Sequence, residues 1–246
     1  MLEVLDPRLP TPLYYQLKEI LSSKIDKGEW VPGQLIPTEN ELIQQYQVSR
    51  TTVREAIIAL VNEGKLEKKQ GKGTIVCHPK YEELLGRLTG FNEEMTSRGL
   101  VPGARVLEVK KLDALEIPKV VMDKLLTRKE EGAYYIKRVR LANGEPISIE
   151  ETYWRSDLSR LFENEELTTE GYYTILEKNG IRLRDADEAI SAAIADEETA
   201  ALLGIDAGDP LLRVVRITNI AHGTPIEYSI NHYRSDRYLY KVHLKR

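Results

Sequence analysis

The stretch Val48-Ser-Arg-Thr-Thr-Val-Arg-Glu-Ala56 decides the first part of the fold. Ser49 is a residue type preferred at helix N-caps, and apolar residues recur at helical spacing from Val53 to Leu60, before the chain reaches Gly64. The sequence therefore predicts a helix that starts after Ser49 and stops at Gly64. If its apolar side is buried, polar side chains near its start face solvent. These are Arg50, Thr51, Arg54 and Glu55.

Two more helices are predicted upstream. Apolar residues at three- and four-residue steps predict a helix over residues 12–27. Thr38 and Glu41 have the spacing of a capping box and predict a second helix over residues 39–46. Only a short break separates it from the helix after Ser49, so the pair has the pattern of a helix-turn-helix.

A basic hairpin follows these helices. Residues 66–69 and 74–77 are predicted strands around the tip Gln70-Gly-Lys-Gly73, which makes a wing. From Gly64 to Lys80 five lysines face one acid, although residues 1–78 carry ten charges of each sign and the whole chain has a net charge of −4. A solvated, charged hairpin is the alternative interpretation. The order of three helices and a basic wing favours DNA binding.

The start of the second helix in a helix-turn-helix enters the major groove, where arginine can pair with guanine. Arg50 and Arg54 are therefore the predicted base readers, unless they form only an ordinary solvated pair. Helix starts can hold phosphate through free N–H groups, and the wing can reach the DNA backbone or the minor groove. The residues predicted for these contacts are Thr38, Glu39, Ser49, Thr51, Lys72 and Thr74.

The same motifs, in order and spacing, resemble the winged helix of the GntR family of bacterial transcription regulators. They are Pro12-Leu-Tyr-Tyr-Gln-Leu17, Gly33-Gln-Leu-Ile-Pro-Thr-Glu-Asn-Glu-Leu42, Val48–Ala56 and Gly71-Lys-Gly-Thr74. The resemblance implies a DNA-binding domain over residues 1–77. It also implies that Arg50, Arg54 and the wing residue Gly73 contact the operator.

Residues 78–87 are charged, lack strong apolar periodicity and are predicted to be a linker. Residues 88–246 are predicted to form a second, α+β domain with a mostly antiparallel sheet, because hairpin signals stand at Asn143-Gly144 and His222-Gly223. Its first helix is expected to end near Gly99. The expected strands are 104–111, 134–142, 146–154, 181–194, 211–221 and 225–234, and the further helices 118–126, 169–179 and 196–203.

Two of these hairpins repeat each other. Residues 144–157 align with residues 223–236, with identical Gly, Pro, Ile, Arg, Ser and Asp at matching places. Strand alternation puts polar residues of both repeats on equivalent faces. Two arginines on a neighbouring strand add cations, so the sheet has the groups that a small polar anion needs, unless this is an ion-paired solvent face. The polar residues are Ser148, Glu150, Thr152, Glu227, Ser229 and Asn231, and the arginines are Arg138 and Arg140.

A second resemblance covers residues 85–243. Leu88-Thr-Gly-Phe91, Arg138-Val-Arg140, Pro146-x-x-x-Glu150, Pro225-Ile-Glu-Tyr228 and Arg234-x-Asp-Arg-Tyr238 are similar to the UTRA effector domain of the HutC subfamily, which has a chorismate-lyase-like fold. In its amino-sugar-responsive members, residues matching Thr89, Gly90, Phe91, Arg138 and Arg140 hold a phosphate. Those matching Glu150, Tyr173, Glu227 and Tyr233 contact the sugar. Gly90 and Gly171 depart from frequent serines, which leaves the effector class open.

The sequence thus predicts a homodimeric regulator, expected to be a repressor, on a near-palindromic operator, with a small anionic effector such as a sugar phosphate, an amino-sugar phosphate or a carboxylate. Effector capture is expected to order residues 89–95, next to the linker, and to change half-site spacing. Two alternatives remain open. Glu150 and Glu227 could be the carboxylate pair of an enzyme, or the protein could be purely architectural on DNA.

Other classes of site have no support in the sequence. Cys77 is the only cysteine and cannot form an intrachain disulfide, and the four histidines lack metal-ligand spacing. No motif for a cofactor or for catalysis occurs, and no apolar run is long enough to span a membrane. A cytoplasmic protein without metal, cofactor or catalytic residues is expected.

Overall fold

The computed structural model describes residues 5–78, 80–84, 86–125 and 132–244. It divides into two units, one ending at Lys80 and the other beginning at Tyr81. Parts of the predicted domains and linker therefore lie outside the described residues, as does the last residue of the helix expected over 118–126. These are residues 1–4, 79, 85, 126–131 and 245–246.

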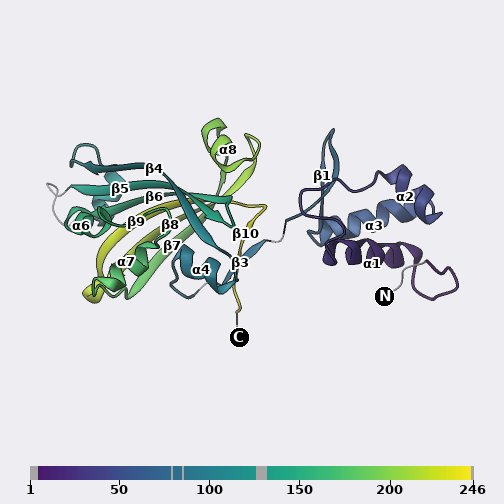
Figure 1. Cartoon of the computed structure of the whole chain (residues 1–246), viewed down its shortest axis with the longest axis horizontal. Helices are drawn as coiled ribbons and strands as arrows, with labels where there is room; N and C mark the ends of the chain where they lie inside the picture. Colours follow the sequence, from purple (N-terminus) through teal and green to yellow (C-terminus); the bar gives the residue numbers. More distant parts are fainter. Residues whose placement is uncertain (1–4, 79, 85, 126–131, 245–246) are drawn as a thin grey trace. The chain divides into compact units, whose positions relative to one another are not determined.

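The first unit is a winged helix. Its elements are α1 (Leu13–Asp26), α2 (Glu39–Tyr46), α3 (Arg50–Asn62), β1 (Leu66–Lys69) and β2 (Gly73–Val76), and the two strands pair antiparallel (Figure 1). All were predicted, because each has a local signal: a cap, an apolar stripe or a glycine turn. Apolar residues from the three helices form one core, which includes Leu17, Leu21, Leu42, Val53, Ala56, Ile57 and Leu60.

The second unit is built on a six-stranded antiparallel sheet in the order β4-β5-β6-β9-β8-β7. This confirms the predicted α+β class. The strands are β4 (Pro102–Leu112), β5 (Ala133–Ala142), β6 (Glu145–Arg155), β7 (Asp185–Ile194), β8 (Pro210–Ile220) and β9 (Thr224–Arg234).

Helices lie on both sides of this sheet. Figure 1 shows α4 (Phe91–Ser97) and α7 (Tyr172–Lys178) on one side and α8 (Glu197–Leu203) on the other. α5 (Lys119–Leu125) packs on the α8 side, because its buried Val121 and Leu125 share a core cluster with Tyr153 and Tyr228. The turns after β6 and β8 are η1 (Ser156–Leu158), which leads into α6 (Ser159–Phe162), and η2 (Ala221–Gly223).

The sheet consists of two similar halves. β4-α5-β5-β6 and β7-α8-β8-β9 have the same order of elements, and the halves meet where β6 pairs with β9. In that pairing Ser148 lies opposite Tyr233 and Trp154 lies opposite Glu227. The two repeated hairpins therefore lie side by side at the centre of the sheet, and their polar faces adjoin.

The structure differs from the sequence prediction in the linker. Within residues 78–87, Tyr81–Leu84 form strand β3, which pairs in parallel with β10 (Tyr238–Lys241). A four-residue strand has no periodicity of its own, and its partner lies near the other end of the chain, so local patterns could not reveal it. Two boundaries also move: β7 begins at Asp185 instead of 181, and α7 begins after Gly171 instead of at 169.

Candidate functional site

The helix-turn-helix is fixed by two capped helix starts. The hydroxyl of Thr38 accepts from the backbone N–H of Glu41, whose carboxylate accepts from the N–H of Thr38 at 2.7 Å. Ser49 caps α3 by accepting from the N–H of Thr52 at 3.1 Å. Gln47 takes a left-handed conformation with φ 53°, which closes the turn between α2 and α3.

The predicted base readers lie together at the start of α3. Arg50, Thr51 and Arg54 are exposed, as their position opposite the buried face requires. The guanidinium of Arg50 donates to the side-chain oxygen of Asn40 at 3.1 Å, which links α3 to α2. Glu39 forms an ion pair with Lys68 of β1 at 3.5 Å. One exposed surface thus combines the helix start with groups from the hairpin.

The wing depends on glycine at its tip. Gly73 has φ +115°, and a Cβ there would lie 3.0 Å from a methyl group of Leu35. A larger residue would be strained by its backbone as well as crowded. Lys72 is exposed and Thr74 half-buried, and the carbonyl of Thr74 accepts from the N–H of Ile36. Thus the hairpin is attached to the segment that leads into α2.

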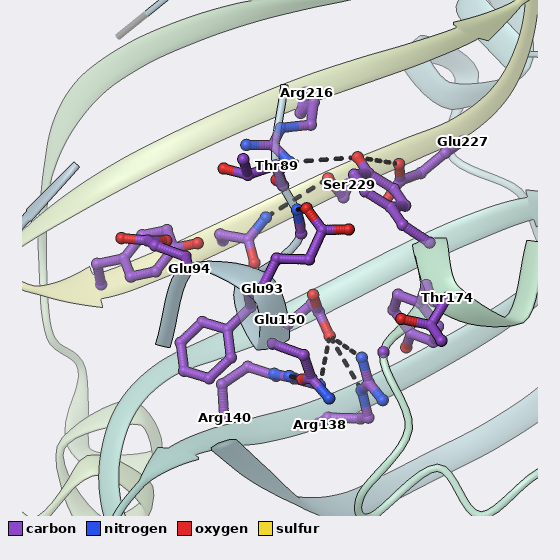
Figure 2. Close-up of a pocket in the computed structure, with 18 residues that line it drawn as sticks. Thr89, Glu93, Glu94, Arg138, Arg140, Glu150, Thr174, Arg216, Glu227 and Ser229 are labelled. Atoms are coloured by element: carbon purple, nitrogen blue, oxygen red, sulfur yellow. Dashed lines mark hydrogen bonds and ion pairs between the residues drawn. The ribbon is translucent and has the colours of Figure 1, made fainter. Parts of the chain in front are cut away.

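The nine residues predicted to bind an effector line one pocket in the second unit, between the sheet and the starts of α4 and α7 (Figure 2). The space between the lining residues is about 540 Å³, which includes open solvent. The polar face of the sheet is therefore not an open solvent face. The nine residues are Thr89, Gly90, Phe91, Arg138, Arg140, Glu150, Tyr173, Glu227 and Tyr233.

Arg138 lies buried in this pocket with several hydrogen-bond partners. It is 1% exposed, donates to one oxygen of Glu150 through Nε at 2.9 Å and Nη2 at 2.7 Å, and also donates to the carbonyl of Leu167. Its guanidinium lies 3.7 Å from the ring centre of Tyr172. Burial alone would raise the pKa of Glu150, but the charges of Arg138 and Arg140 outweigh it and hold that pKa below its ordinary value. The charges of Arg138 and Glu150 therefore neutralise each other.

Arg140 is buried with less compensation. It is 2% exposed, its guanidinium stacks 4.4 Å from the ring centre of Phe91, and Nη2 donates to the side-chain oxygen of Asn92. Its distance to Glu150 is 3.9 Å, and its buried Nε has no hydrogen-bond partner among the residues that the structure describes. Burial, and then the charge of Arg138, lowers the pKa of Arg140 to about 10. This guanidinium can therefore still receive an anion.

A second carboxylate lies at the opposite side of the pocket. Glu227 is 3% exposed and accepts from the hydroxyl of Thr218 at 2.6 Å and from that of Tyr173 at 3.0 Å. Burial raises its pKa to about 6, although Thr218 and the charge of Arg216 act against this rise. The carboxylate of Glu227 can accept a hydrogen bond from a hydroxyl or an amine, so the pocket offers a cation at one side and an acceptor at the other (Figure 2).

The two glycines that depart from serine have a steric role. A Cβ at Gly90 would lie 3.2 Å from the ring of Tyr173, and one at Gly171 would lie 3.1 Å from the Cβ of Asn92. Both distances are tighter than ordinary contact, so a side chain would push these neighbours outward. The glycines let Tyr173 and Asn92 pack closely against the backbone at positions 90 and 171.

Sequence reasoning missed Arg216, which donates to the hydroxyl of Tyr173, to the carbonyl of Thr89 and to Glu188. By strand pairing it is the counterpart of Arg138, because Arg138 lies opposite Glu150 and Arg216 lies opposite Ser229, the repeat equivalent of Glu150. The second hairpin has one more residue, so a fixed spacing does not align the arginines. Other lining residues not predicted are Asn92, Glu93, Glu94, Tyr172 and Thr174.

The described ranges contain no group of three or more histidine, cysteine or acidic side chains placed to hold a metal ion. In the same ranges, no helix has both the length and the hydropathy that a membrane span requires.

Two family models match the chain. Residues 13–76 match the gntR family of bacterial regulatory proteins, and residues 97–239 match the UTRA domain. The HTH-type transcriptional repressor NagR of Bacillus subtilis is 35% identical over 96% of each chain. The mannosyl-D-glycerate transport/metabolism system repressor MngR of Escherichia coli is 29% identical over 94% of this chain and 95% of its own.

Structural similarity agrees with the sequence matches. The crystal structure of PhnF from Mycobacterium smegmatis covers 95% of this chain and 99% of its own, with a TM-score of 0.65 and 25% identity. The matching families and relatives are transcription regulators, so the enzyme alternative is wrong. Together with the winged helix and the polar pocket, these matches show the family. The chain belongs to the GntR family of bacterial transcription regulators, in the branch with a UTRA domain.

Proposed function

We propose that this regulator is a repressor released from its operator by a small anionic metabolite. The observation that carries this proposal is the guanidinium of Arg140, buried in a pocket with an unpartnered Nε and a lowered pKa. A carboxylate or phosphate supplies the missing acceptor and charge, while Glu227 and Asn231 receive hydroxyl or amine groups. The name of MngR is consistent with this, because mannosyl-D-glycerate is a sugar with a carboxylate.

The test is a binding screen on the full chain. Sugar phosphates, amino-sugar phosphates, sugar acids and small carboxylates are compared with their neutral parent sugars by thermal shift, since a ligand of the native state raises its stability. We expect stabilisation by one class of anion and by no neutral parent. The same anion must then weaken operator binding in a gel shift. Equal stabilisation by a neutral sugar would contradict the anion proposal.

We also propose that the protein binds a near-palindromic operator as a homodimer. In this complex, α3 lies in the major groove and the wing lies on the adjacent DNA backbone. The exposure of Arg50, Arg54 and Lys72 supports this. Replacing Arg54 by alanine is expected to weaken operator binding by about 1–3 kcal/mol and to relax base preference at one position of each half-site. Binding to operators randomised at single positions measures both effects.

Arg8 provides the matched control for this experiment. It is exposed, lies before α1 and pairs with Asp6 at 2.9 Å. Arg8→Ala is expected to leave base preference unchanged. If Arg54→Ala weakened binding to all sequences equally, Arg54 would be a phosphate contact and not a base reader.

A chain of contacts leads from the pocket to β3, the first strand of the second unit. Tyr233, which lines the pocket, stacks on Tyr238 with ring centres 4.1 Å apart. The hydroxyl of Tyr238 donates to Glu94, another lining residue, at 2.5 Å. Tyr238 begins β10, which pairs with β3, and β3 follows the DNA-binding unit directly in sequence. We infer that an effector contacting Tyr233 or Glu94 acts on the connecting segment through Tyr238.

Replacing Tyr238 by phenylalanine tests this route. The ring stack stays, the hydroxyl contact to Glu94 is lost, and the ratio of operator affinities without and with effector is expected to fall, while effector affinity is retained. Operator titrations at zero and saturating effector measure that ratio. Tyr240→Phe is the control, because Tyr240 lies on the same strand and does not line the pocket. An unchanged ratio in Tyr238→Phe would exclude the hydroxyl from the coupling.

A further inference from the structure

Arg140 uses only half of the paired donors that its guanidinium offers. Its neighbour Arg138 presents Nε and Nη2 side by side and binds one oxygen of Glu150 with both, at 2.9 and 2.7 Å (Figure 2). On Arg140, Nη2 donates to the side-chain oxygen of Asn92, while Nε has no hydrogen-bond partner in the part of the chain that the structure describes. A carboxylate or phosphate binds such a fork through two oxygens. One amide oxygen therefore fills half of a site that an anion would fill completely.

Asn92 is held on Arg140 by its other neighbours. It is the second residue of α4, and its amide nitrogen donates at 2.7 Å to the carbonyl of Thr169, in the segment between α6 and α7. Arginine only donates and a carbonyl only accepts, so the two contacts determine which end of the amide faces each group. Gly171 leaves room for this side chain, because a Cβ at position 171 would lie 3.1 Å from the Cβ of Asn92. Asn92 therefore ties the start of α4 both to the sheet and to the segment before α7.

We propose that Asn92 is an internal competitor of the effector: its amide oxygen and the anionic group of the effector exclude each other on Arg140. This inference rests on the proposed function, in which Arg140 receives the anion. The exchange favours the anion, because two charge-assisted hydrogen bonds replace one bond to a neutral amide. The guanidinium is also 2% exposed and 3.9 Å from Glu150, so a closer negative charge stabilises it. Asn92 thus sets a threshold of affinity that a ligand of this site must exceed.

Displacement of Asn92 gives the effector a direct effect on α4. The contact between Asn92 and Arg140 joins the start of α4 to β5. Two residues later, α4 carries Glu94, whose carboxylate accepts from the hydroxyl of Tyr238 on β10. When an anion takes the place of Asn92, α4 loses its hydrogen bond to β5, and the change reaches Tyr238 through the same short helix. An effector that contacts neither Tyr233 nor Glu94 can therefore still act on β10.

Two substitutions at Asn92 are expected to change anion affinity in opposite directions. Asn92→Ala removes the competitor and is expected to raise the affinity roughly tenfold, as for loss of one competing hydrogen bond to a charged group. Asn92→Asp keeps an oxygen beside Arg140 and adds a negative charge, so the affinity is expected to fall by at least a similar factor. Calorimetric titration of the full chain at constant ionic strength measures both, with inorganic phosphate and acetate as the probes.

Gly171→Ala tests the same contact without changing residue 92. The added Cβ displaces the side chain of Asn92, so anion affinity is expected to rise as in Asn92→Ala. Asn179→Ala is the matched control, because the amide of Asn179 also donates to a carbonyl, that of Ile175, but Asn179 does not line the pocket. Its anion affinity is expected to equal that of the unchanged protein.

The titrations separate failure of the competitor from failure of the proposed function. If the unchanged protein binds an anion and Arg140→Met does not, but affinity fails to rise in both Asn92→Ala and Gly171→Ala, the competitor role is overturned and the anion proposal stands. If neither the unchanged protein nor Asn92→Ala binds phosphate or acetate, both are overturned. A merely structural role for Asn92 would lower affinity in Asn92→Ala as well as in Asn92→Asp. Thermal melts check that each variant retains the fold.

Discussion

Replacing Arg140 by methionine abolishes the response to effector and leaves operator binding intact: this is the expected result for the residue that receives the anion. Methionine keeps much of the volume beside Phe91 but removes the charge and the unpartnered Nε. Because that charge is buried and poorly compensated, its removal is expected to leave the free energy of unfolding unchanged or higher. Effector affinity should fall by at least about 2 kcal/mol, as for truncation of one partner of a buried charge pair.

Arg213→Met is the matched control for this variant. Arg213 lies on β8 with its side chain on the opposite face from Arg216, away from the pocket-lining set. Calorimetric titration with the stabilising anion and operator gel shifts should show loss only in Arg140→Met. Retained anion affinity in Arg140→Met would refute the assignment, and loss of operator binding together with effector binding would indicate a structural role.

Arg138→Met is expected to behave differently, by lowering the free energy of unfolding by about 3–5 kcal/mol. Arg138 donates twice to Glu150 and once to the carbonyl of Leu167, and all of these groups are buried. Without Arg138, Glu150 keeps a cation only at longer range, with Arg140 at 3.9 Å and a weaker contribution from Arg216. Stability is lost because the carboxylate of Glu150 and the carbonyl of Leu167 stay buried without their donor, which costs more than the loss of a surface ion pair.

Urea denaturation measures this loss, and a double variant identifies its source. Arg138→Met combined with Glu150→Gln removes both charges, and we expect it to recover a large part of the lost stability, because the two residues are coupled. If the double variant were as unstable as the sum of the single variants, the destabilisation would come from packing against Tyr172. A loss below about 1 kcal/mol in Arg138→Met would mean that Glu150 is solvated in solution.

The winged helix could be predicted from sequence because its signals are local. Thr38 and Ser49 both act as the predicted caps, and Gly73 takes the positive φ of the predicted turn. The effector residues are harder, because they come from segments far apart in the chain. The repeat supplied the strand faces, and the resemblance supplied Thr89 and Tyr173 from outside the sheet. Whether these residues bind an effector remains a prediction.

The features that sequence reasoning missed depend on pairings that no local pattern records. Arg216 was missed because the second hairpin is one residue longer than the first, which shifts its position in the repeat. Asn92 and Glu94 follow the predicted Thr89–Phe91 loop, but their contacts with Arg140 and Tyr238 arise only when α4 packs on the sheet. Strand β3 depends on β10, which is its partner from near the other chain end.

The two-half sheet also constrains how the protein folds. Each half, β4-α5-β5-β6 or β7-α8-β8-β9, pairs strands that are close in sequence, whereas the pairing of β6 with β9 joins Trp154 to Glu227 and Ser148 to Tyr233. Closing the longer loop between β6 and β9 costs more entropy, so each half is expected to form before β6 pairs with β9. Arg140 and Glu227 belong to different halves. A nascent chain therefore has no effector pocket until β9 has been synthesised and has docked, and sensing begins only with the finished fold.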